Sequence, residues 1–299
     1  MTVAATAGAP PCQGPDPVIR APAFPIPAGA VDTHAHVIGA HDAYPMVANR
    51  SYTPPPAPEA AYLAMLDGLH MSRGVLVQIS VYGTDNRCMV QTLRAHPDRL
   101  RGVAVVSPDV SDRELEELAA AGVKGIRINV LFGGGVAMDE LERLAARVAP
   151  LGWHIQLLLD ARALPELGPR IAALPVEVVV DHIGHMPVTE GIDHPGFQML
   201  LRLMRDGRAW TKLSGAYRIS GTGAPFHDTL AFAQAVVDAA PDRCVWGSDW
   251  PHVAVSGPMF NTTDLLDLLP LWVPDEAQRR RILVDNPARL YGFPTPTAG

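Results

Sequence analysis

Two histidines separated by one residue stand near the start of the chain, in the segment Asp32-Thr33-His34-Ala35-His36. Side chains alternate along an extended strand, so His34 and His36 point to the same face. Two imidazoles presented to one point in space suit a divalent metal ion or a polarised substrate oxygen. Two satisfied surface histidines would give the same pattern, so the interpretation depends on partners elsewhere in the chain.

Such partners stand far downstream, where two apolar runs end. Asp181-His182 closes one run, and Gly247-Ser248-Asp249-Trp250-Pro251-His252 closes the other. A polar residue at the end of an apolar strand needs a reason, because burying it without a partner costs about 1–3 kcal/mol. A site shared with the first histidine pair supplies that reason. Alternatively, Asp249 caps the segment that follows it, and His182 is a core histidine bonded to a backbone carbonyl.

Eight short apolar runs bounded by turn residues predict the strands that position these groups. Most of the runs are nearly continuous in Val, Ile and Leu, which is typical of parallel strands covered by helices. Helical patterns lie between them: a capping box at Ser111–Glu114 begins a helix to about Ala121, and Asp139–Val148 and Asp228–Ala240 are also helical. A repeat of about 27 residues predicts a (β/α)8 TIM barrel, with a doubly wound sheet as the competing interpretation. The expected strands are Ala30–Val37, Gly74–Ser80, Arg101–Ser107, Gly122–Asn129, Trp153–Asp160, Val176–His182, Trp210–Gly215 and Arg243–Asp249.

In a (β/α)8 barrel, catalytic and binding residues gather at the carboxyl ends of the strands. Arg127 stands inside an apolar strand, where it either binds substrate or pairs with an acid such as Glu177 or Asp181. Arg218 follows the seventh strand in a loop, where it either binds substrate or is solvated. Asp32 and Asp181 are expected to orient histidines or to cap loops. The candidate substrate-binding residues are Arg127, Arg218, Ser80, Tyr82, Gln156, His185, Tyr44 and His252.

The composition excludes several classes of partner. The chain has 299 residues, 48% of them hydrophobic, and a formal net charge of −7 with no basic run, so nucleic acid and anionic membranes are poor partners. No apolar stretch approaches the roughly 20 residues that span a bilayer, and the N-terminus does not resemble a signal peptide. Cys12, Cys88 and Cys244 are far apart and lack C-x-x-C spacing, which indicates reduced thiols in a cytoplasmic protein.

Both ends of the chain differ in composition from the rest. Residues 1–28 are rich in Ala and Pro and predict an extended or partly disordered arm. Such an arm lies across its own domain or across a neighbouring subunit, so the sequence is compatible with a homo-oligomer. A short Pro-Thr-Pro-Thr tail follows Phe293. Residues 29–299 are expected to form one barrel domain.

The order of these motifs resembles the amidohydrolase superfamily. The residues that carry the resemblance are His34 and His36, His182, Asp249 in GSDWPH, and the segment 285–293. Within the superfamily, the chain is most similar to the lactonase branch typified by 2-pyrone-4,6-dicarboxylate lactonase. That similarity covers residues from about 30 to 293 and rests on VLVQIS, LRGVAVV, GVKGIRIN, VVVDHIGH and WTKLSGAYRIS.

The resemblance implies a hydrolase that opens the ring of a carboxylated lactone, a cyclic ester. Asp249 would be the general base that takes a proton from water. The three histidines would stabilise the oxyanion, directly or through one metal ion. Arg127 and Arg218 would hold the carboxylate of the substrate.

Two departures from the superfamily limit the metal. Binuclear members use a bridging Lys or Glu on strand 4 and a His on strand 5, where this chain has Arg127 and either Gln156 or Leu158. His154 stands at the start of strand 5, toward the barrel bottom. The lactonase branch is able to work without a metal, so we expect either no cofactor or a single divalent ion, most suitably Zn²⁺. The ligands of that ion would be His34, His36, His182 and Asp249.

Two further departures concern the substrate. Gly133 and His185 stand where the pyrone-dicarboxylate lactonase would place arginines. An arginine–carboxylate fork is a strong, geometry-selective contact, so the loss of two such forks changes the substrate. We expect a small-molecule lactone with one carboxylate, or with hydroxyls as in a sugar-acid lactone. The alternatives are a sugar-acid lactonase or lactone isomerase, a mononuclear zinc-dependent decarboxylase, and a non-catalytic ligand-binding barrel.

Overall fold

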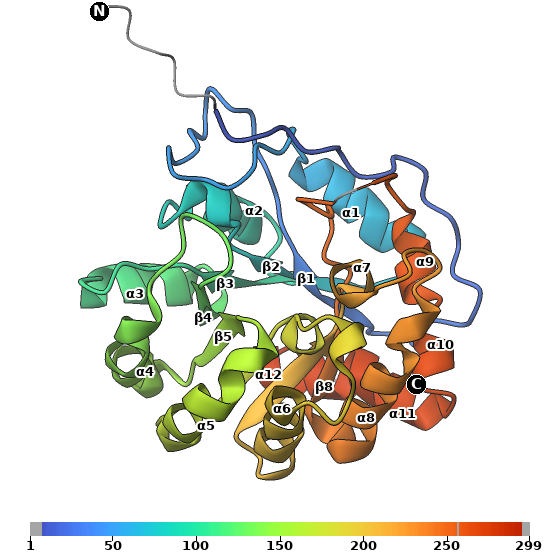
Figure 1. Cartoon of the computed structure of the whole chain (residues 1–299). Coiled ribbons are helices and arrows are strands. Elements are labelled where there is room, and N and C mark those ends of the chain that lie inside the picture. The colour runs from blue at the N-terminus through green and yellow to red at the C-terminus, as the bar shows by residue number, and fades with distance from the viewer. Residues whose placement is uncertain (1–7, 256, 295–299) are drawn as a thin grey trace, which may run out of the picture.

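A computed structural model describes residues 8–255 and 257–294 of the chain. Eight parallel strands form one sheet in the order β1 to β8, and helices surround it (Figure 1). This arrangement confirms the predicted (β/α)8 barrel. The strands are β1 Val31–Ala35, β2 Arg73–Val77, β3 Leu100–Ala104, β4 Val123–Asn129, β5 His154–Leu158, β6 Val178–Val180, β7 Ala209–Leu213 and β8 Cys244–Trp246.

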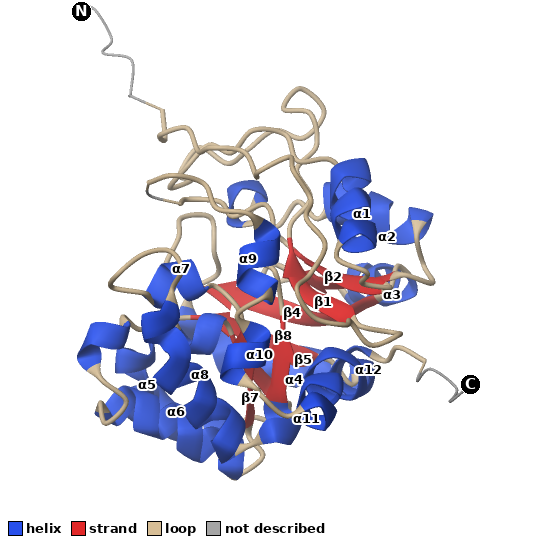
Figure 2. Ribbon diagram, turned by 90° about the vertical axis from the view of Figure 1, so that its right-hand side faces the viewer, coloured by secondary structure: helices blue, strands red, loops and turns tan. Residues whose placement is uncertain are grey.

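Helices follow the strands and cover the outside of the barrel, while the long loops gather at one end (Figure 2). Ser111 caps α3 as predicted, since its side chain accepts a hydrogen bond from Glu114 N at 3.2 Å. The helices predicted over residues 139–148 and 228–240 each begin two residues later than expected, after a 3₁₀ turn. Within the described residues, no helix is both long and apolar enough to cross a membrane. The helices are α1 Glu59–Gly68, α2 Arg87–Ala95, α3 Asp112–Ala120, α4 Leu141–Val148, α5 Leu164–Ala173, α6 Pro195–Arg205, α7 Ala216–Ile219, α8 Leu230–Ala239, α9 Thr262–Leu266, α10 Leu269–Trp272, α11 Glu276–Arg280 and α12 Asn286–Tyr291.

The barrel closes between its first strand and the segment that follows its last strand. His36 N donates a hydrogen bond to Trp250 O at 2.8 Å, and Asp249 N donates to His34 O at 2.8 Å. These bonds place Asp249 opposite the two histidines across the closing seam. The meeting of the two motifs is therefore a consequence of barrel closure.

Two strands end earlier than predicted at the carboxyl end of the barrel. Strand β6 stops at Val180 and β8 at Trp246, whereas we expected them to reach His182 and Asp249. The reason is backbone geometry: φ is 53° at His182 and 61° at Asp249, in the left-handed region that no strand contains. A 3₁₀ turn over Ser80–Tyr82 likewise follows β2 in place of the predicted strand end.

Aromatic and apolar side chains close the opposite end of the barrel. Tyr291 and Phe293 pack in one cluster with Val31 and Val75, near the starts of β1 and β2. His154, at the start of β5, packs edge-on against Tyr291 with ring centroids 5.4 Å apart. This confirms that His154 points to the barrel bottom, away from the other histidines.

The described part of the N-terminal arm lies across its own barrel. Cys12 N donates to Thr53 O at 2.8 Å, and Thr263 Oγ1 on α9 donates to Arg20 O at 2.8 Å. Figure 1 shows this segment running along the loop end of the barrel and down its side. Residues 1–7 of the arm and the Pro-Thr-Pro-Thr tail beyond Pro294 lie outside the described residues. The three cysteines are free, as expected.

Candidate active site

Three imidazoles converge on one carboxylate at the carboxyl end of the barrel. The Nε2 atoms of His34 and His36 lie 3.7 and 3.8 Å from Asp249 Oδ1, and His182 Nε2 lies 3.7 Å from Oδ2 of the same carboxylate. His34 lies in β1 and His36 directly after it, His182 lies in the turn after β6, and Asp249 lies in the loop after β8. All four residues, which we call the floor, are at most 3% exposed. The structure therefore brings the four predicted catalytic residues together.

Two of the imidazoles are oriented by a partner on their outer nitrogen. His36 Nδ1 lies 2.8 Å from Val77 O, and His182 Nδ1 lies 2.9 Å from Ser214 Oγ. A carbonyl oxygen only accepts, so neutral His36 carries its proton on Nδ1 and presents an unprotonated Nε2 to the site. The partner of His182 is a hydroxyl, so the alternative of a core histidine bonded to a backbone carbonyl is wrong.

Asp249 is held by two donors on one of its oxygens. Arg218 Nε donates to Oδ2 at 2.6 Å, and the Tyr217 hydroxyl donates to it at 2.7 Å. Burial alone would raise the pKa of Asp249, but the Arg218 charge and the three histidines outweigh burial and hold that pKa well below its usual value. The carboxylate is therefore ionised at neutral pH, with Oδ2 occupied and Oδ1 directed at His34 and His36.

Arg218 lies elsewhere than the sequence predicted. It belongs to the short helix α7 rather than to a loop, and its side chain is only 7% exposed. Its Nη2 donates to Val253 O at 3.2 Å, in addition to the bond from Nε to Asp249. The solvated alternative is therefore wrong. Among the described residues, Nη1 is the guanidinium nitrogen of Arg218 that is left for a ligand.

A network of charged and amide side chains, which we call the His34 frame, lies behind the floor. Asp181 Oδ2 accepts hydrogen bonds from Arg127 Nη2 at 3.2 Å and from Gln156 Nε2 at 3.0 Å. Asp181 Oδ1 lies 3.3 Å from His34 Nδ1. Lys212 Nζ donates to Gln156 Oε1 at 2.7 Å and lies 3.3 Å from His34 Nδ1. Arg127 and Gln156, both expected at the substrate, are therefore bonded into the frame that orients His34.

The site residues predicted from the sequence leave out two members of this arrangement. Lys212 on β7 is completely buried, and burial lowers the pKa of its ammonium to about 8. The signal was a lysine inside the apolar run 209–213, where a charge without a partner would be too costly. Tyr217, the second missed residue, bonds Asp249, and its only signal was its place beside Arg218.

The two acids that precede histidines have the orienting roles expected of them. Asp32 Oδ1 accepts a hydrogen bond from Ser248 N at 2.8 Å, and Oδ2 accepts from Ser248 Oγ at 2.7 Å and from the Tyr62 hydroxyl at 3.2 Å. These bonds fix the loop that carries Asp249. Asp181 contacts His34, as described above, so it orients a histidine of the floor.

Six non-glycine residues in the turns after β6 and β8 hold a left-handed backbone. The φ angle is 53° at His182 and at Ile183, 50° at His185, 61° at Asp249 and at His252, and 58° at Ala254. Residues other than glycine adopt this conformation at a cost of about 1–3 kcal/mol each, and such residues cluster at active sites and ligand clamps. The concentration of left-handed residues here marks the carboxyl end of the barrel as its functional end.

Tyr217 and Arg218, the two residues that hold Asp249, line a cavity of about 680 Å³. His185, another predicted substrate-binding residue, also lines it. The outer wall comes from loops after β4, β7 and β8 and combines apolar side chains with polar ones such as Ser220 and Asp264. We call its large apolar side chains the mouth: Phe132, Phe226, Met259 and Phe260.

Three predicted substrate-binding residues lie behind the cavity rather than in its wall. His252 Nε2 lies 2.9 Å from Thr262 Oγ1 on α9. Ser80 Oγ lies 2.9 Å from the Tyr52 hydroxyl, in the turn after β2. The Tyr82 hydroxyl is buried without a hydrogen-bond partner in the described part of the chain.

Tyr44 lies outside the site. Its hydroxyl donates to Gln91 Oε1, and its ring packs on Tyr82 with centroids 6.3 Å apart. The cavity wall does not include it. Among the described residues, the contacts of Tyr44 are therefore packing contacts, and its predicted contact with the substrate stays a prediction.

The sequence profile of the family described as Amidohydrolase matches residues 31–293 of this chain. The chain belongs to the amidohydrolase family. This finding confirms the resemblance drawn from the order of the histidine and aspartate motifs, and it agrees with the barrel and with the position of its floor.

Named relatives of this amidohydrolase lie in the lactonase branch. It is 41% identical over 281 residues to the 2-pyrone-4,6-dicarboxylate hydrolase of Comamonas testosteroni, which covers 90% of this chain and 92% of the relative. It is 39% identical over 297 residues to a 4-sulfomuconolactone hydrolase of Rhizobium radiobacter, covering 98% of this chain and 99% of the relative. The crystal structure of a probable 2-pyrone-4,6-dicarboxylic acid hydrolase from Acinetobacter baumannii, with citric acid bound, superposes with a TM-score of 0.79 at 30% identity, over 89% of this chain and 100% of that one.

The floor of this amidohydrolase could hold a metal ion. His34, His36 and Asp249 each offer a ligand atom, all within 4.8 Å of one another, and so do His34, Asp181 and His182. Imidazole nitrogens with a carboxylate oxygen are a donor set that suits Zn²⁺. His34 Nε2 and Asp249 Oδ1 are buried without a hydrogen-bond partner among the described residues, so the first group fits a divalent ion. The two groups share His34, and the second lies against the cations of the His34 frame, which oppose a second ion.

Proposed function

We propose that this amidohydrolase hydrolyses the ring of a lactone that bears a carboxylate. The observation that carries the proposal is the floor: three imidazole nitrogens surround an ionised carboxylate with one oxygen free of hydrogen bonds. An arginine that holds the same carboxylate lines the adjoining cavity. Relatives named as hydrolases of a pyrone dicarboxylate and of a sulfomuconolactone support the same reaction class.

Asp249 would act as the general base. Its Oδ1 takes a proton from water while the water oxygen attacks the ring carbonyl carbon, and the carbonyl electron pair moves onto oxygen. When that pair returns, the bond between the acyl carbon and the ring oxygen breaks. Asp249 then gives its proton to the departing ring oxygen. Lactone and water are thus converted to one open-chain hydroxy acid, and the carboxylate of Asp249 is regenerated.

The three imidazoles would have different tasks in this reaction. His36 presents an unprotonated Nε2, so it accepts a hydrogen bond and aligns the attacking water. Ser214 Oγ lies where it can donate to His182 Nδ1, which places the proton of that ring on Nε2, toward the developing oxyanion. Such a donor is worth about 10²–10³ in rate. His34 Nδ1 lies 3.3 Å from both Lys212 Nζ and Asp181 Oδ1. Donation from Lys212 makes Nε2 of His34 a second donor to the oxyanion, whereas donation to Asp181 leaves it an acceptor.

We propose Zn²⁺ as the ion where the floor binds a metal. A divalent ion held by His34, His36 and Asp249 supplies Lewis-acid polarisation of the ring carbonyl. Because Arg127 and Gln156 stand in the bridging positions, we expect at most one ion per chain. Elemental analysis of the purified protein measures this number, and a value close to two would contradict the assignment of the ligands.

The substrate would carry a single carboxylate, held by Arg218. At Gly133, a Cβ atom would lie 2.1 Å from Asn49 O, so an arginine does not fit there without movement of the loop. At the other position, burial lowers the pKa of His185 below its usual value, so its ring is neutral at neutral pH. We therefore expect monocarboxylated lactones to exceed pyrone-dicarboxylate in kcat/KM by at least about tenfold, which corresponds to about 1.4 kcal/mol.

A panel of carboxylated lactones tests the proposed function. Ring opening at neutral pH releases an acid, which a pH indicator follows continuously, and each substrate is assayed with and without a chelator. An isomerase would convert the lactone without acid release, and a decarboxylase would release CO₂. The absence of acid release from every lactone would overturn the proposal.

A further inference from the structure

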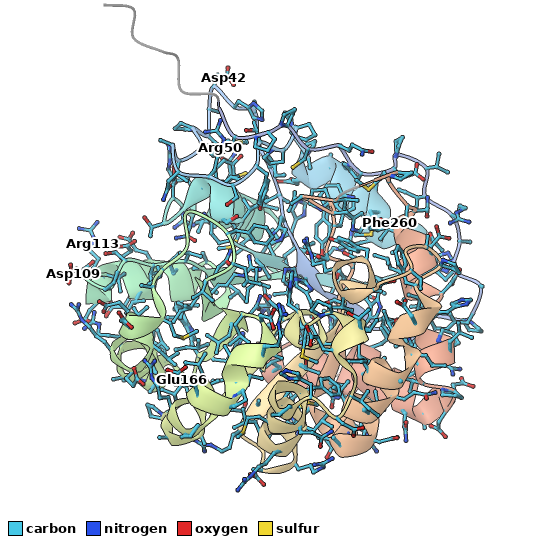
Figure 3. The ribbon with its side chains drawn as sticks, viewed as in Figure 1. Asp42, Arg50, Asp109, Arg113, Glu166 and Phe260 are labelled. Atoms are coloured by element: carbon cyan, nitrogen blue, oxygen red, sulfur yellow. The ribbon has the colours of Figure 1, made fainter. Side chains whose placement is uncertain are left out.

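Aromatic surface stands open at the mouth of the cavity. Phe260 is its centre: its ring centroid lies 4.6 Å from that of Tyr217 and 5.4 Å from that of Phe226. Figure 3 shows Phe260 beside α7, close to the start of α9. Phe132 and Met259 add further apolar surface, and both are only partly buried. Apolar surface that faces a binding cavity marks the part of a ligand that the cavity covers.

The charged groups of the cavity wall are already paired. Arg218 is bonded to Asp249, and Asp264, the acid in the wall, is paired with Arg20 of the N-terminal arm. Apart from Nη1 of Arg218, the described wall therefore offers no cation to a second anionic group of a substrate. A second carboxylate would lose water there without gaining an ion pair, which is unfavourable.

The cavity is also larger than a small lactone ring with two carboxylates requires. Its volume of about 680 Å³ lies within the range that holds drug-sized ligands. The cavity wall includes Arg218 and Tyr217, which hold Asp249, and none of the four floor residues, so a lactone whose carboxylate meets Arg218 leaves the apolar wall at Phe132 and Phe260 to a substituent. Burial of an apolar group against these rings is favourable, and aromatic pairs add to the effect of area alone.

From these observations we propose that the mouth binds an apolar substituent, an aryl or branched alkyl group, on the substrate lactone. This inference rests on the proposed function and names its substrate class: a monoanionic lactone whose carboxylate meets Arg218 and whose apolar arm lies against Phe260. The mouth thus selects the substrate, while the floor performs the ring opening.

A matched substrate series tests the inference. One carboxylated lactone ring is prepared with a second substituent that is hydrogen, phenyl, hydroxymethyl or carboxylate, and kcat/KM is measured for each. We expect the phenyl compound to exceed the hydroxymethyl and carboxylate compounds by about tenfold or more, as burial of an aromatic group predicts. Equal or better turnover of the carboxylate or hydroxymethyl compound would overturn the inference alone. Failure of the whole series to react would overturn the proposed function as well.

A variant locates the preference in the mouth. Phe260→Ala is expected to lower the ratio of kcat/KM for the phenyl compound over the hydrogen compound by about tenfold. Met259→Ala serves as a second variant in case Phe260→Ala does not fold, and circular dichroism reports the folded state of both. Leu271→Ala, on α10 with 49% exposure and outside the cavity wall, is the control that leaves the ratio unchanged. A ratio that is the same in the mouth variants and in the control would contradict the proposal.

Discussion

The floor and the mouth of this barrel are built by different means. In the floor, His36, His182 and Asp249 each have a hydrogen-bond partner at 2.6–2.9 Å, supplied by the end of β2, by the residue after β7 and by the helix α7. In the mouth, Phe132 and Phe260 lie on loops, contact their neighbours through ring packing, and are partly exposed. Directional bonds fix atoms to a few tenths of an ångström, whereas apolar packing is non-directional.

This difference separates two tasks. Proton transfer and oxyanion stabilisation need donors and acceptors within hydrogen-bond reach of the reacting atoms, and a rigid barrel end provides that placement. Selection of a substituent needs only a surface of suitable size and polarity, which loops provide and can exchange. The floor therefore determines the reaction class, and the mouth determines which lactone is opened.

The largest effect is expected when the floor loses its base. Asp249→Asn keeps the shape of the side chain but cannot take the proton from water, so kcat should fall by about 10³-fold or more. Because Arg218 loses its counter-charge, the melting temperature should fall too, and the assay must be normalised to folded protein by circular dichroism. Activity within about threefold of the unchanged enzyme would remove Asp249 from the role of base.

The next largest effect is expected in the His34 frame. Arg127→Met removes one of the two cations beside the buried Asp181 and leaves Lys212 as the other, and breaking a buried pair in this way costs up to about 3–5 kcal/mol of unfolding free energy. Chemical denaturation measures this loss. Arg113→Met is the matched control, since its pair with Glu117 is exposed and contributes about 0.2–1 kcal/mol.

The same variant separates the frame from a substrate contact. If Arg127 only holds His34 in place through Asp181, its loss should lower kcat/KM for anionic and neutral lactones alike. A loss confined to anionic lactones, with little change in stability, would instead assign Arg127 to the carboxylate of the substrate.

Much of the fold could be predicted because the strands are nearly continuous apolar runs. Such runs show parallel strands directly, and their number and spacing indicate a barrel. The floor could be predicted for a related reason: His34, His182 and Asp249 all stand where an apolar run ends, and the carboxyl ends of barrel strands meet at one face.

The strand ends, the bond between Arg218 and Asp249 and the contacts of Lys212 could not be predicted, because they depend on tertiary contacts that leave no local pattern in the sequence. The left-handed turns at His182 and Asp249 have no signal in the apolar runs, so the predicted strands were too long. The bond from Arg218 to Asp249 depends on the orientation of the short helix α7. Lys212 is a charge in an apolar run, and only the positions of Gln156 and Thr33 show what it contacts.

A smaller effect is expected from the hydroxyl that holds the base. Tyr217→Phe removes one of the two donors to Asp249 Oδ2 and leaves the ring in the cavity wall. A hydrogen bond to a charged group is worth about 1.5–3 kcal/mol. We expect part of this energy to be lost from the transition state, so that kcat falls by about tenfold and KM changes much less. Steady-state kinetics gives both constants. A rise in KM at constant kcat would show that the hydroxyl binds substrate instead of positioning the base.

The smallest effect is expected at Tyr44. The sequence predicted that this residue contacts the substrate, whereas the structure shows it packed outside the cavity wall. Its hydroxyl donates to Gln91 on α2 and does not reach the cavity wall. Tyr44→Phe loses one partly exposed hydrogen bond between neutral groups, which is worth about 0.5–1.5 kcal/mol of stability, and no contact with the floor or the mouth. We therefore expect kcat/KM to change by less than about twofold for every lactone in the series. A loss of about tenfold or more for one substrate, with unchanged stability, would show that Tyr44 reaches the ligand and that the mouth extends to the turn after β1.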